Sequence, residues 1–231
     1  MAGILYGAGV GPGDPELMTL RTVRLIRENE VIALPGPVAE ETVAFQIAVQ
    51  AVPELAQKTL VPVAMPMTHD QDEMNRNHDK AAQIIEAYLN KEQNVVFLTL
   101  GDPTIYSTYL YVQKRIAARG YRTELVSGIT SFCAAAARTN TSLAEWNEQL
   151  HIVPAVHRLD SRLDIPGNYV LMKSGRKMNQ VKEILAASGK EVIMVENCGM
   201  DNEHIYRGVE EIPDDAGYYS LIIAKEPHTQ A

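Results

Sequence analysis

Short apolar runs alternate with amphipathic stretches along the first half of the chain. Runs rich in apolar residues occupy about 4–10, 31–34, 59–63 and 95–100, and the stretches between them carry apolar residues at helical spacing. Continuous apolar runs this short are typical of parallel strands covered on both faces. The pattern therefore predicts a series of βα units that build a mostly parallel sheet.

The second half of the chain has shorter connections and a mixed order of elements. Strands are expected at 121–126, 149–155, 169–172, 191–196 and 218–224, helices at 131–137 and 177–187, and a short hairpin arm at 204–208. This order favours a partly antiparallel sheet. We therefore expect two α/β domains, residues 1–121 with a mostly parallel sheet and residues 122–231 with a mixed sheet.

Composition narrows the class of protein. The 231 residues are 46 % hydrophobic and 22 % charged, which is ordinary for a soluble globular chain. The formal net charge of −8 argues against nucleic acid or an anionic membrane surface as the main partner. No apolar run approaches the ~18 residues of a membrane span, and the N-terminus lacks the basic region of a signal peptide, so a cytoplasmic location is expected.

Cysteine and histidine spacing gives no metal signature. Cys133 and Cys198 are far apart and form no Cys-x-x-Cys pair, and the six histidines follow no ligand pattern. We expect no protein-bound metal. Cys133 lies in an apolar stretch without a basic neighbour, which favours a buried structural thiol over a reactive one.

The first expected strand runs into a glycine-proline loop. After Gly7 and Gly9, a dinucleotide fingerprint needs a third glycine at position 12, which is Pro12, and no P-loop lysine motif occurs in the chain. A dehydrogenase is therefore disfavoured. From Glu16 a helix is expected, and Asp14 is placed either to cap it or to face a cleft.

The strand at 95–100 ends abruptly at Gly101-Asp102-Pro103, and a helix is expected from Pro103 to Gly120. In an open α/β sheet such a strand end is where ligands bind, because the amides of the turn are free to contact them. A plain βα connection would look much the same, so this stretch alone leaves both interpretations open.

Three ordered stretches resemble the tetrapyrrole methylases that use S-adenosylmethionine: residues 9–20 (GVGPGDPELMTL), 100–109 (LGDPTIYSTY) and 126–132 (VSGITSF). The resemblance runs from Ile4 to about Ala224. Together with Met-Pro-Met-Thr at 65–68, it is most similar to the members that methylate C20 of precorrin-2 or its cobalt form in cobalamin synthesis. Ser127-Gly128 stands where the family more often has Pro-Gly, and 35–37 lacks a lysine that relatives often carry.

The resemblance implies two α/β domains with the active site in the cleft between them, S-adenosylmethionine as methyl donor with S-adenosylhomocysteine as product, and a homodimer. It implies a set of donor-binding residues, and, for the tetrapyrrole, the loop Gly11, Pro12, Gly13 and Asp14, with Arg21 and Lys173 as candidate contacts to its carboxylates. The implied donor-binding residues are Gly101, Asp102, Pro103, Thr104, Tyr106, Thr130, Ser131, Met172, Asn197, Cys198 and Ser220.

The implied reaction moves the donor's methyl group to an electron-rich ring carbon, after which a proton must leave that carbon. Tyr106 and Asp14 are candidate bases, and proton loss to solvent or to a substrate carboxylate is equally compatible. Methylation at another ring position, such as C2 and C7 of uroporphyrinogen III, and a non-catalytic regulator that binds an adenosine ligand are the alternatives. Cobalt-containing and metal-free substrates both fit.

Overall fold

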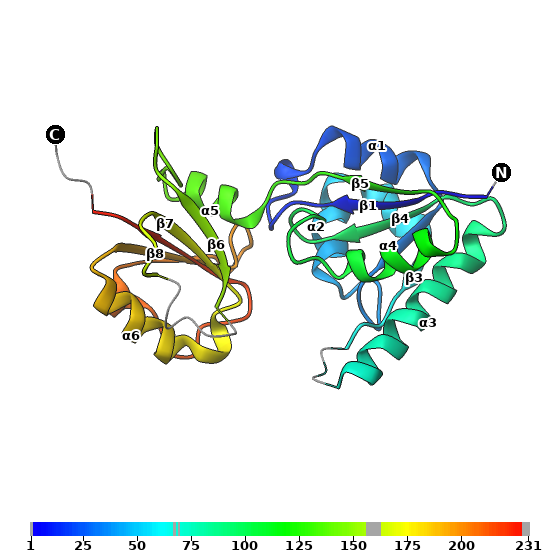
Figure 1. Cartoon of the computed structure of the whole chain (residues 1–231). Coiled ribbons are helices and arrows are strands. Elements are labelled where there is room, and N and C mark those ends of the chain that lie inside the picture. The colour runs from blue at the N-terminus through cyan, green and yellow to red at the C-terminus, as the bar shows by residue number, and fades with distance from the viewer. Residues whose placement is uncertain (1, 67, 69, 156–162, 228–231) are drawn as a thin grey trace. The chain divides into compact units, whose positions relative to one another are not determined.

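The computed structural model describes residues 2–66, 68, 70–155 and 163–227. It divides into two compact units, Met1–Thr130 and Ser131–Ala231. The first runs from blue to green and the second from green to red in Figure 1. One residue of the expected Met-Pro-Met-Thr run, at position 67, lies outside the described residues.

The first unit is built on a parallel sheet of order β3-β2-β4-β1-β5. Its central strands β1 and β4 are apolar along their length because helices cover both faces. The predicted parallel sheet is therefore confirmed. The strands are β1 (Leu5–Gly9), β2 (Val31–Leu34), β3 (Thr59–Pro62), β4 (Val95–Thr99) and β5 (Thr123–Val126).

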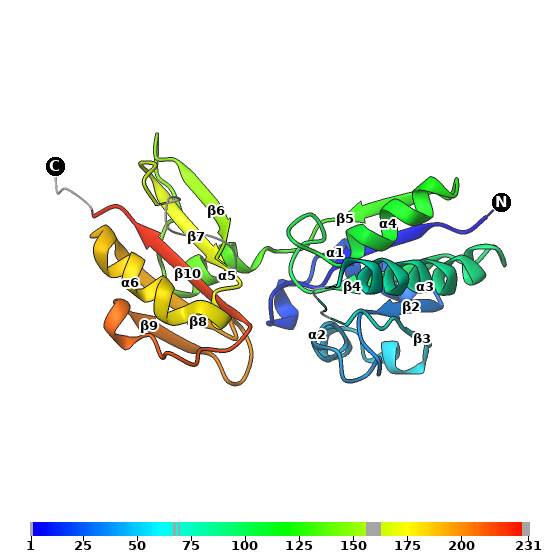
Figure 2. The same ribbon diagram turned by 60° about the horizontal axis from the view of Figure 1, so that its bottom comes forward.

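Alternate residues of each strand face different helices. On β4, Val96 and Leu98 join the core under α1 (Leu20–Glu28) and α2 (Val43–Ala51). Val95 and Phe97 join the core under α3 (Gln71–Leu89) and α4 (Tyr109–Ala118). Figure 2 shows α3 and α4 side by side on their face of the sheet. This two-sided burial leaves the strand ends as the places where loops can carry chemistry.

The second unit carries a mixed sheet of order β6-β7-β10-β8-β9. β6 (Leu150–Pro154) and β7 (Asn168–Met172) are parallel, whereas β10 (Ser220–Lys225) runs antiparallel to β7 and to β8 (Glu191–Glu196), and β9 (His204–Arg207) runs antiparallel to β8. α6 (Met178–Ser188) packs into the core on one face, and α5 (Ser131–Arg138) contacts β10. The expected mixed sheet is confirmed.

Two helices begin later than the sequence pattern predicts. α1 begins at Leu20, because Pro15–Leu17 forms a separate 3₁₀ turn and Thr19 caps the helix by accepting from Thr22 N. α4 begins at Tyr109 instead of Pro103. Tyr106 has a φ of +50°, which interrupts any helix passing through it.

The boundary between the units also differs from the expected one. β5 pairs in parallel with β1, so residues 123–126 belong to the first sheet, and the division falls after Thr130 instead of after residue 121. The apolar run at 121–126 looked the same in either sheet, because register with a distant strand is not visible in sequence. Cys133 is exposed, which makes the expectation of a buried thiol wrong.

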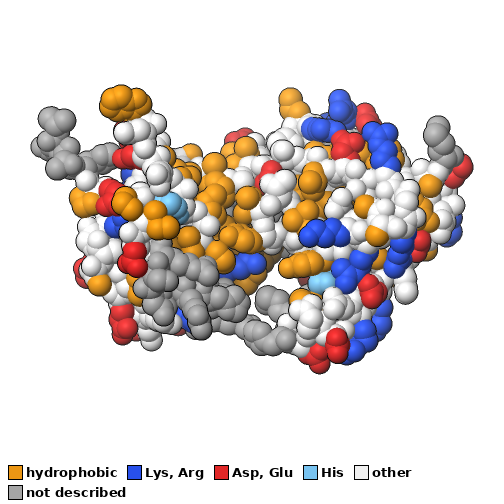
Figure 3. All heavy atoms as spheres, in the orientation of Figure 1, with side chains coloured by type: hydrophobic (Ala, Val, Ile, Leu, Met, Phe, Trp, Pro, Cys, Tyr) orange, Lys and Arg blue, Asp and Glu red, His pale blue; other side chains and the backbone are white. Residues whose placement is uncertain are grey.

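Charged side chains of both signs share the surface of the first unit. On the face drawn in Figure 3, its Lys and Arg side chains lie among Asp and Glu side chains, and several are paired directly, as in Arg115 with Asp79 (2.6 Å) and Arg119 with Glu86 (2.6 Å). Among the described residues, no helix has the length and apolar character that crossing a membrane would need.

Candidate functional site

The loops that follow β4, β1 and β5 lie next to one another, because these three strands are neighbours in the first sheet. Gly101 N donates to Gly11 O at 2.8 Å, and Gly11 N donates back to Gly101 O at 3.3 Å. Val10 N extends the contact by donating to Thr99 O at 2.9 Å. The loop after β1 and the loop after β4 are thus held together by backbone hydrogen bonds where both strands end.

A glycine stands at the end of each of these strands because the backbones cross at very short range. A Cβ on Gly9 would lie 2.3 Å from Gly101 O and 2.8 Å from Gly128 Cα. A Cβ on Gly128 would lie 2.2 Å from the same carbonyl oxygen. Only residues without a side chain allow this approach. From sequence, Gly9 and Gly128 were noted only within their motifs and not as residues in close contact, although a glycine at the end of three strands was the available signal.

Asp102 ties the loop after β4 to the loop after β5. Its Oδ2 accepts from Gly128 N at 2.9 Å, and its Oδ1 accepts from Thr104 N at 2.8 Å and from the Thr104 hydroxyl. The side chain is almost fully buried. A carboxylate that accepts several N–H and O–H groups is well matched to burial. Asp102 therefore organises the loop from inside.

The loop 101–107 is fixed at its far end as well. Thr99 Oγ1 and Ser107 Oγ are 2.9 Å apart, and Ser107 Oγ accepts from Tyr109 N at 3.2 Å at the start of α4. Gly101 and Pro103 are buried, whereas Thr104 and Tyr106 are exposed. Of the residues expected to bind the donor here, Thr104 and Tyr106 thus present side chains at the surface of a pre-formed loop.

Thr130 ends the first unit in the connection after β5. Its hydroxyl oxygen is buried, and no group among the described residues forms a hydrogen bond with it. Buried hydroxyls are nearly always paired in folded proteins. Thr130 is thus one of the few buried polar groups of the described chain whose hydrogen-bonding capacity is unused.

The expected tetrapyrrole loop is compact. Gly11, Pro12 and Gly13 are buried, and Asp14 Oδ1 accepts from Glu16 N at 2.8 Å, which caps the 3₁₀ turn. Of the two alternatives for Asp14, capping is thus the one observed. Arg21 forms an ion pair with Glu124 of β5, so its guanidinium is engaged within the first unit.

The expected residues of the second unit gather at one edge of its sheet. Leu221 pairs with Met172 and Ser220 pairs with Glu196 in the antiparallel registers, and Asn197 N donates to Tyr219 O at 3.1 Å. This brings together Met172, Lys173, Asn197, Cys198 and Ser220. Ser131 is instead the first residue of α5.

Positive φ values and one buried hydroxyl without a hydrogen-bond partner occur at the same edge. Lys173 and Asn197 have φ values of +61° and +52°, in the left-handed region that side chains rarely adopt. Burial lowers the pKa of the Lys173 ammonium below its ordinary value. The neighbouring Ser174 is fully buried, and its Oγ has no hydrogen-bond partner among the described residues. Strained, incompletely paired strand ends are typical of ligand sites.

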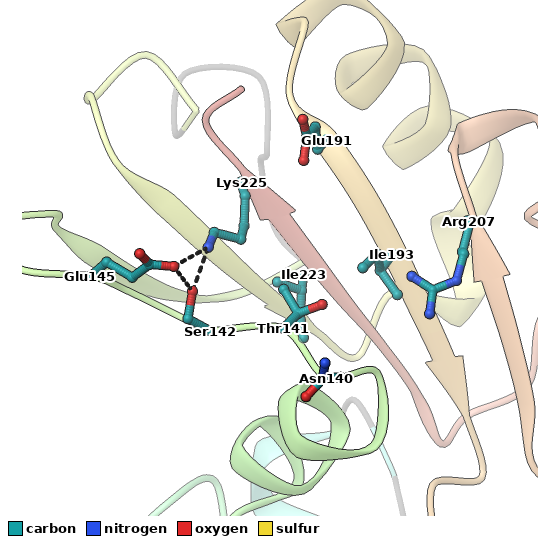
Figure 4. Close-up of a pocket in the computed structure, with 9 residues that line it drawn as sticks. All are labelled: Asn140, Thr141, Ser142, Glu145, Glu191, Ile193, Arg207, Ile223 and Lys225. Carbon is teal, nitrogen blue, oxygen red and sulfur yellow. Dashed lines mark hydrogen bonds and ion pairs between the residues drawn. The ribbon is translucent and has the colours of Figure 1, made fainter. Parts of the chain in front are cut away.

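A cavity of about 340 Å³ opens elsewhere on the second unit (Figure 4). Lys225 is buried at one side, where its Nζ donates to Ser142 Oγ at 2.8 Å and lies 3.7 Å from Glu145 Oε1. The cavity lining contains two acidic and two basic side chains, so its formal charge is balanced. None of the site residues expected from the sequence lines this cavity. The lining is Asn140, Thr141, Ser142, Glu145, Glu191, Ile193, Arg207, Ile223 and Lys225.

Within the described ranges, no three His, Cys, Asp or Glu side chains are grouped so that they could hold a metal ion. The polar groups at the two strand-end clusters are hydroxyls, amides, backbone groups, the Cys198 thiol, one lysine and the carboxylates of Asp14 and Asp102, which already accept hydrogen bonds from backbone N–H groups. Such groups suit an organic ligand with hydrogen-bonding and anionic parts.

The chain is similar over its whole length to known proteins. The chain is 30 % identical over 226 residues to a probable cobalt-precorrin-2 C(20)-methyltransferase of Methanocaldococcus jannaschii, with 96 % of this chain and 95 % of the relative covered. It is 28 % identical to a precorrin-2 C(20)-methyltransferase of a Sinorhizobium species, with 96 % and 94 % covered.

The fold also matches solved structures. The crystal structure of uroporphyrin-III C-methyltransferase from Thermus thermophilus, complexed with S-adenosylhomocysteine, superposes with a TM-score of 0.69 at 23 % identity, covering 97 % of this chain and 98 % of that one. Residues 4–213 match the profile of the tetrapyrrole (corrin/porphyrin) methylases, a span that takes in all three loops after β1, β4 and β5 and most of the second unit. The chain belongs to the tetrapyrrole methylase family.

Proposed function

We propose that this protein transfers a methyl group from S-adenosylmethionine to C20 of precorrin-2 or cobalt-precorrin-2 in cobalamin biosynthesis. The observation that carries this proposal is the similarity, over nearly the whole chain, to two relatives whose names both specify C20 of precorrin-2 or its cobalt form.

The donor would be held by strand-end residues of each unit. In the first unit these are Gly101, Pro103, Thr104, Tyr106 and Thr130, with Asp102 keeping the loop in shape. In the second they are Ser131, Met172, Asn197, Cys198 and Ser220. The unpartnered hydroxyls of Thr130 and Ser174 support this assignment, because a bound ligand would supply the missing hydrogen bonds.

The donor supplies a methyl group that its sulfonium already activates. The chain therefore needs to align the reacting groups and exclude water, and it needs no metal for this step. The loop 101–107 suits that task because it is anchored at both ends by Asp102 and Ser107. A pre-formed loop avoids the ordering cost that a mobile one would add on binding.

The tetrapyrrole would contact the loop Gly11–Asp14, and Arg21 and Lys173 would meet its carboxylates. Tyr106 and Asp14 are the candidate groups for taking up the proton that leaves C20. Asp14 Oδ1 already accepts from Glu16 N, so the Asp14 role needs its second oxygen. Tyr106 is exposed on the anchored loop and is the first of the two to test.

The test is an anaerobic incubation with S-adenosylmethionine carrying a ¹³C-methyl group, with precorrin-2 and cobalt-precorrin-2 in parallel. We expect label at C20, located by mass and carbon NMR, and preference for one substrate would fix the metal state. Label at another carbon would support methylation at another ring position, and uroporphyrinogen III, added as a third substrate, tests the C2 and C7 alternative. Donor binding with no turnover on either substrate would support the regulator. We further propose a homodimer, which sedimentation of the same preparation would test.

A further inference from the structure

The loop between β8 and β9 is folded back on itself. Met200 N donates to Asn197 O at 3.0 Å, Asn197 Nδ2 donates to Asn202 O at 3.3 Å, and Glu203 N donates to Met200 O at 3.0 Å. Asn197 and Gly199 both have positive φ values. Glycine adopts this region freely and asparagine more readily than most residues, so the sequence suits the turn, and the three hydrogen bonds hold Asn197 and Cys198 in one loop conformation.

Glu203 closes this loop with its carboxylate. Its Oε2 accepts from Gly199 N at 2.7 Å, and its Oε1 accepts from Arg138 Nε at 2.6 Å. The side chain is only 11 % exposed. Burial alone would raise the pKa of the Glu203 carboxyl, but the bonds from Gly199 N and Arg138 hold it below its ordinary value. Glu203 is therefore ionised at neutral pH.

Arg138 connects the loop to α5. It is the last residue of that helix, whose first residue is Ser131, and α5 contacts β10, which begins at Ser220. One carboxylate thus joins the loop after β8 to the helix that packs on the neighbouring strand. Residues from three elements of the second unit share this connection.

We propose that Arg138 and Glu203 are positioning residues that hold Asn197 and Cys198 in their donor-binding conformation. The inference rests on the proposed function, because it concerns the same donor site. The pair does not touch the donor. Its role is to fix the loop through Gly199 and the end of α5.

The expected effect of losing this ion pair on global stability differs from its expected effect on donor binding. The Arg138 side chain is 62 % exposed, and ion pairs with one such partner contribute little to global stability. A binding loop that is not held in place must be ordered when the ligand binds, and that ordering cost weakens affinity directly. Loss of the ion pair should therefore weaken donor binding measurably while leaving the melting temperature almost unchanged.

The experiment measures S-adenosylhomocysteine affinity by calorimetry, melting temperature, and amide exchange at Gly199 in the full chain. Glu203→Ala should raise the Kd about tenfold and speed exchange at Gly199, and Arg138→Ala should act in the same direction while leaving the Gly199 bond in place. Arg138→Lys, which keeps the charge, should restore affinity to within about twofold.

The matched control is Asp214→Asn, which removes an ion pair of the same 2.6 Å length, with Lys182, in the same unit. It should leave the Kd unchanged. If Arg138→Ala binds as tightly as the Asp214→Asn control, or if both weaken binding equally, the positioning role is wrong. If the unaltered protein itself fails to bind S-adenosylhomocysteine, the proposed function is wrong, and this result does not depend on the variants.

Discussion

Replacing Gly128 with alanine is the sharpest test of the crossing of loops after β1, β4 and β5. The new Cβ would lie 2.2 Å from Gly101 O and 2.9 Å from Gly9 Cα. Both obstacles are backbone, and side-chain carbons essentially never approach within 3.0 Å, so Gly101 O would have to move by about 1 Å. Forcing an extra carbon into packed surroundings costs ~1–3 kcal/mol.

The displacement also strains the bond from Gly128 N to Asp102 Oδ2, and hydrogen bonds to charged groups contribute ~1.5–3 kcal/mol. We therefore expect Gly128→Ala to destabilise the first unit by about 2–5 kcal/mol and to abolish tight S-adenosylhomocysteine binding. Gly120→Ala is the control. Its Cβ meets nothing within 4 Å, but its φ is +88°, so it should cost only ~1–2 kcal/mol and leave binding intact.

The assay is urea unfolding followed by far-UV circular dichroism, with hydrogen exchange of peptides covering β1, β4 and β5. Tryptophan fluorescence is a poor probe here, because the only tryptophan, Trp146, is fully exposed and lies in the second unit. If Gly128→Ala costs no more than Gly120→Ala and binds S-adenosylhomocysteine normally, the loops do not need the close approach and the reasoning is refuted.

Three further predictions follow from single side chains. Asp102→Asn should lower the free energy of unfolding of the first unit by ~1–3 kcal/mol in urea, because the amide nitrogen cannot accept the hydrogen bond that one of the two carboxylate oxygens accepts. An unchanged unfolding midpoint would contradict this. Arg21→Ala and Lys173→Ala should each raise the KM for the tetrapyrrole in a methyl-transfer assay and leave the calorimetric Kd for S-adenosylhomocysteine unchanged; loss of donor binding would indicate structural damage instead. Burial, and after it the charge of Arg115, lowers the pKa of His78, so the unfolded chain takes up the proton first as the pH falls. Stability should therefore decrease as the pH drops through about 6.5, and His78→Gln should flatten that slope in urea titrations.

The strands were predictable because each has a simple burial environment. β4 is apolar from Val95 to Leu98 because helices cover both faces, and this pattern is visible in the sequence. The assignment of β5 was not predictable in the same way. Its partner β1 lies more than a hundred residues earlier in the chain, and only the backbone pairing between them shows that 123–126 belongs to the first sheet.

The start of α4 was missed because one residue breaks a locally favourable helix start. Pro103 is a favourable first-turn residue, and Asp102 Oδ1 accepts from Thr104 N as an N-cap residue would. Tyr106, however, takes a φ of +50°, and α4 begins only at Tyr109. Local propensity therefore favoured a helix start, and nothing in the sequence pattern marked the positive φ of Tyr106.

The two basic residues that the sequence suggested for the substrate differ in their surroundings. Arg21 is paired with Glu124, so a substrate carboxylate would have to compete with a carboxylate already in place. Lys173 is half-buried at a strained strand end, where desolvation opposes its charge. An anionic ligand beside Lys173 would offset that desolvation cost and raise the pKa of Lys173. Beside Arg21, the same ligand would gain less interaction energy. On an acidic chain, the tetrapyrrole carboxylates should therefore depend more on Lys173 than on Arg21.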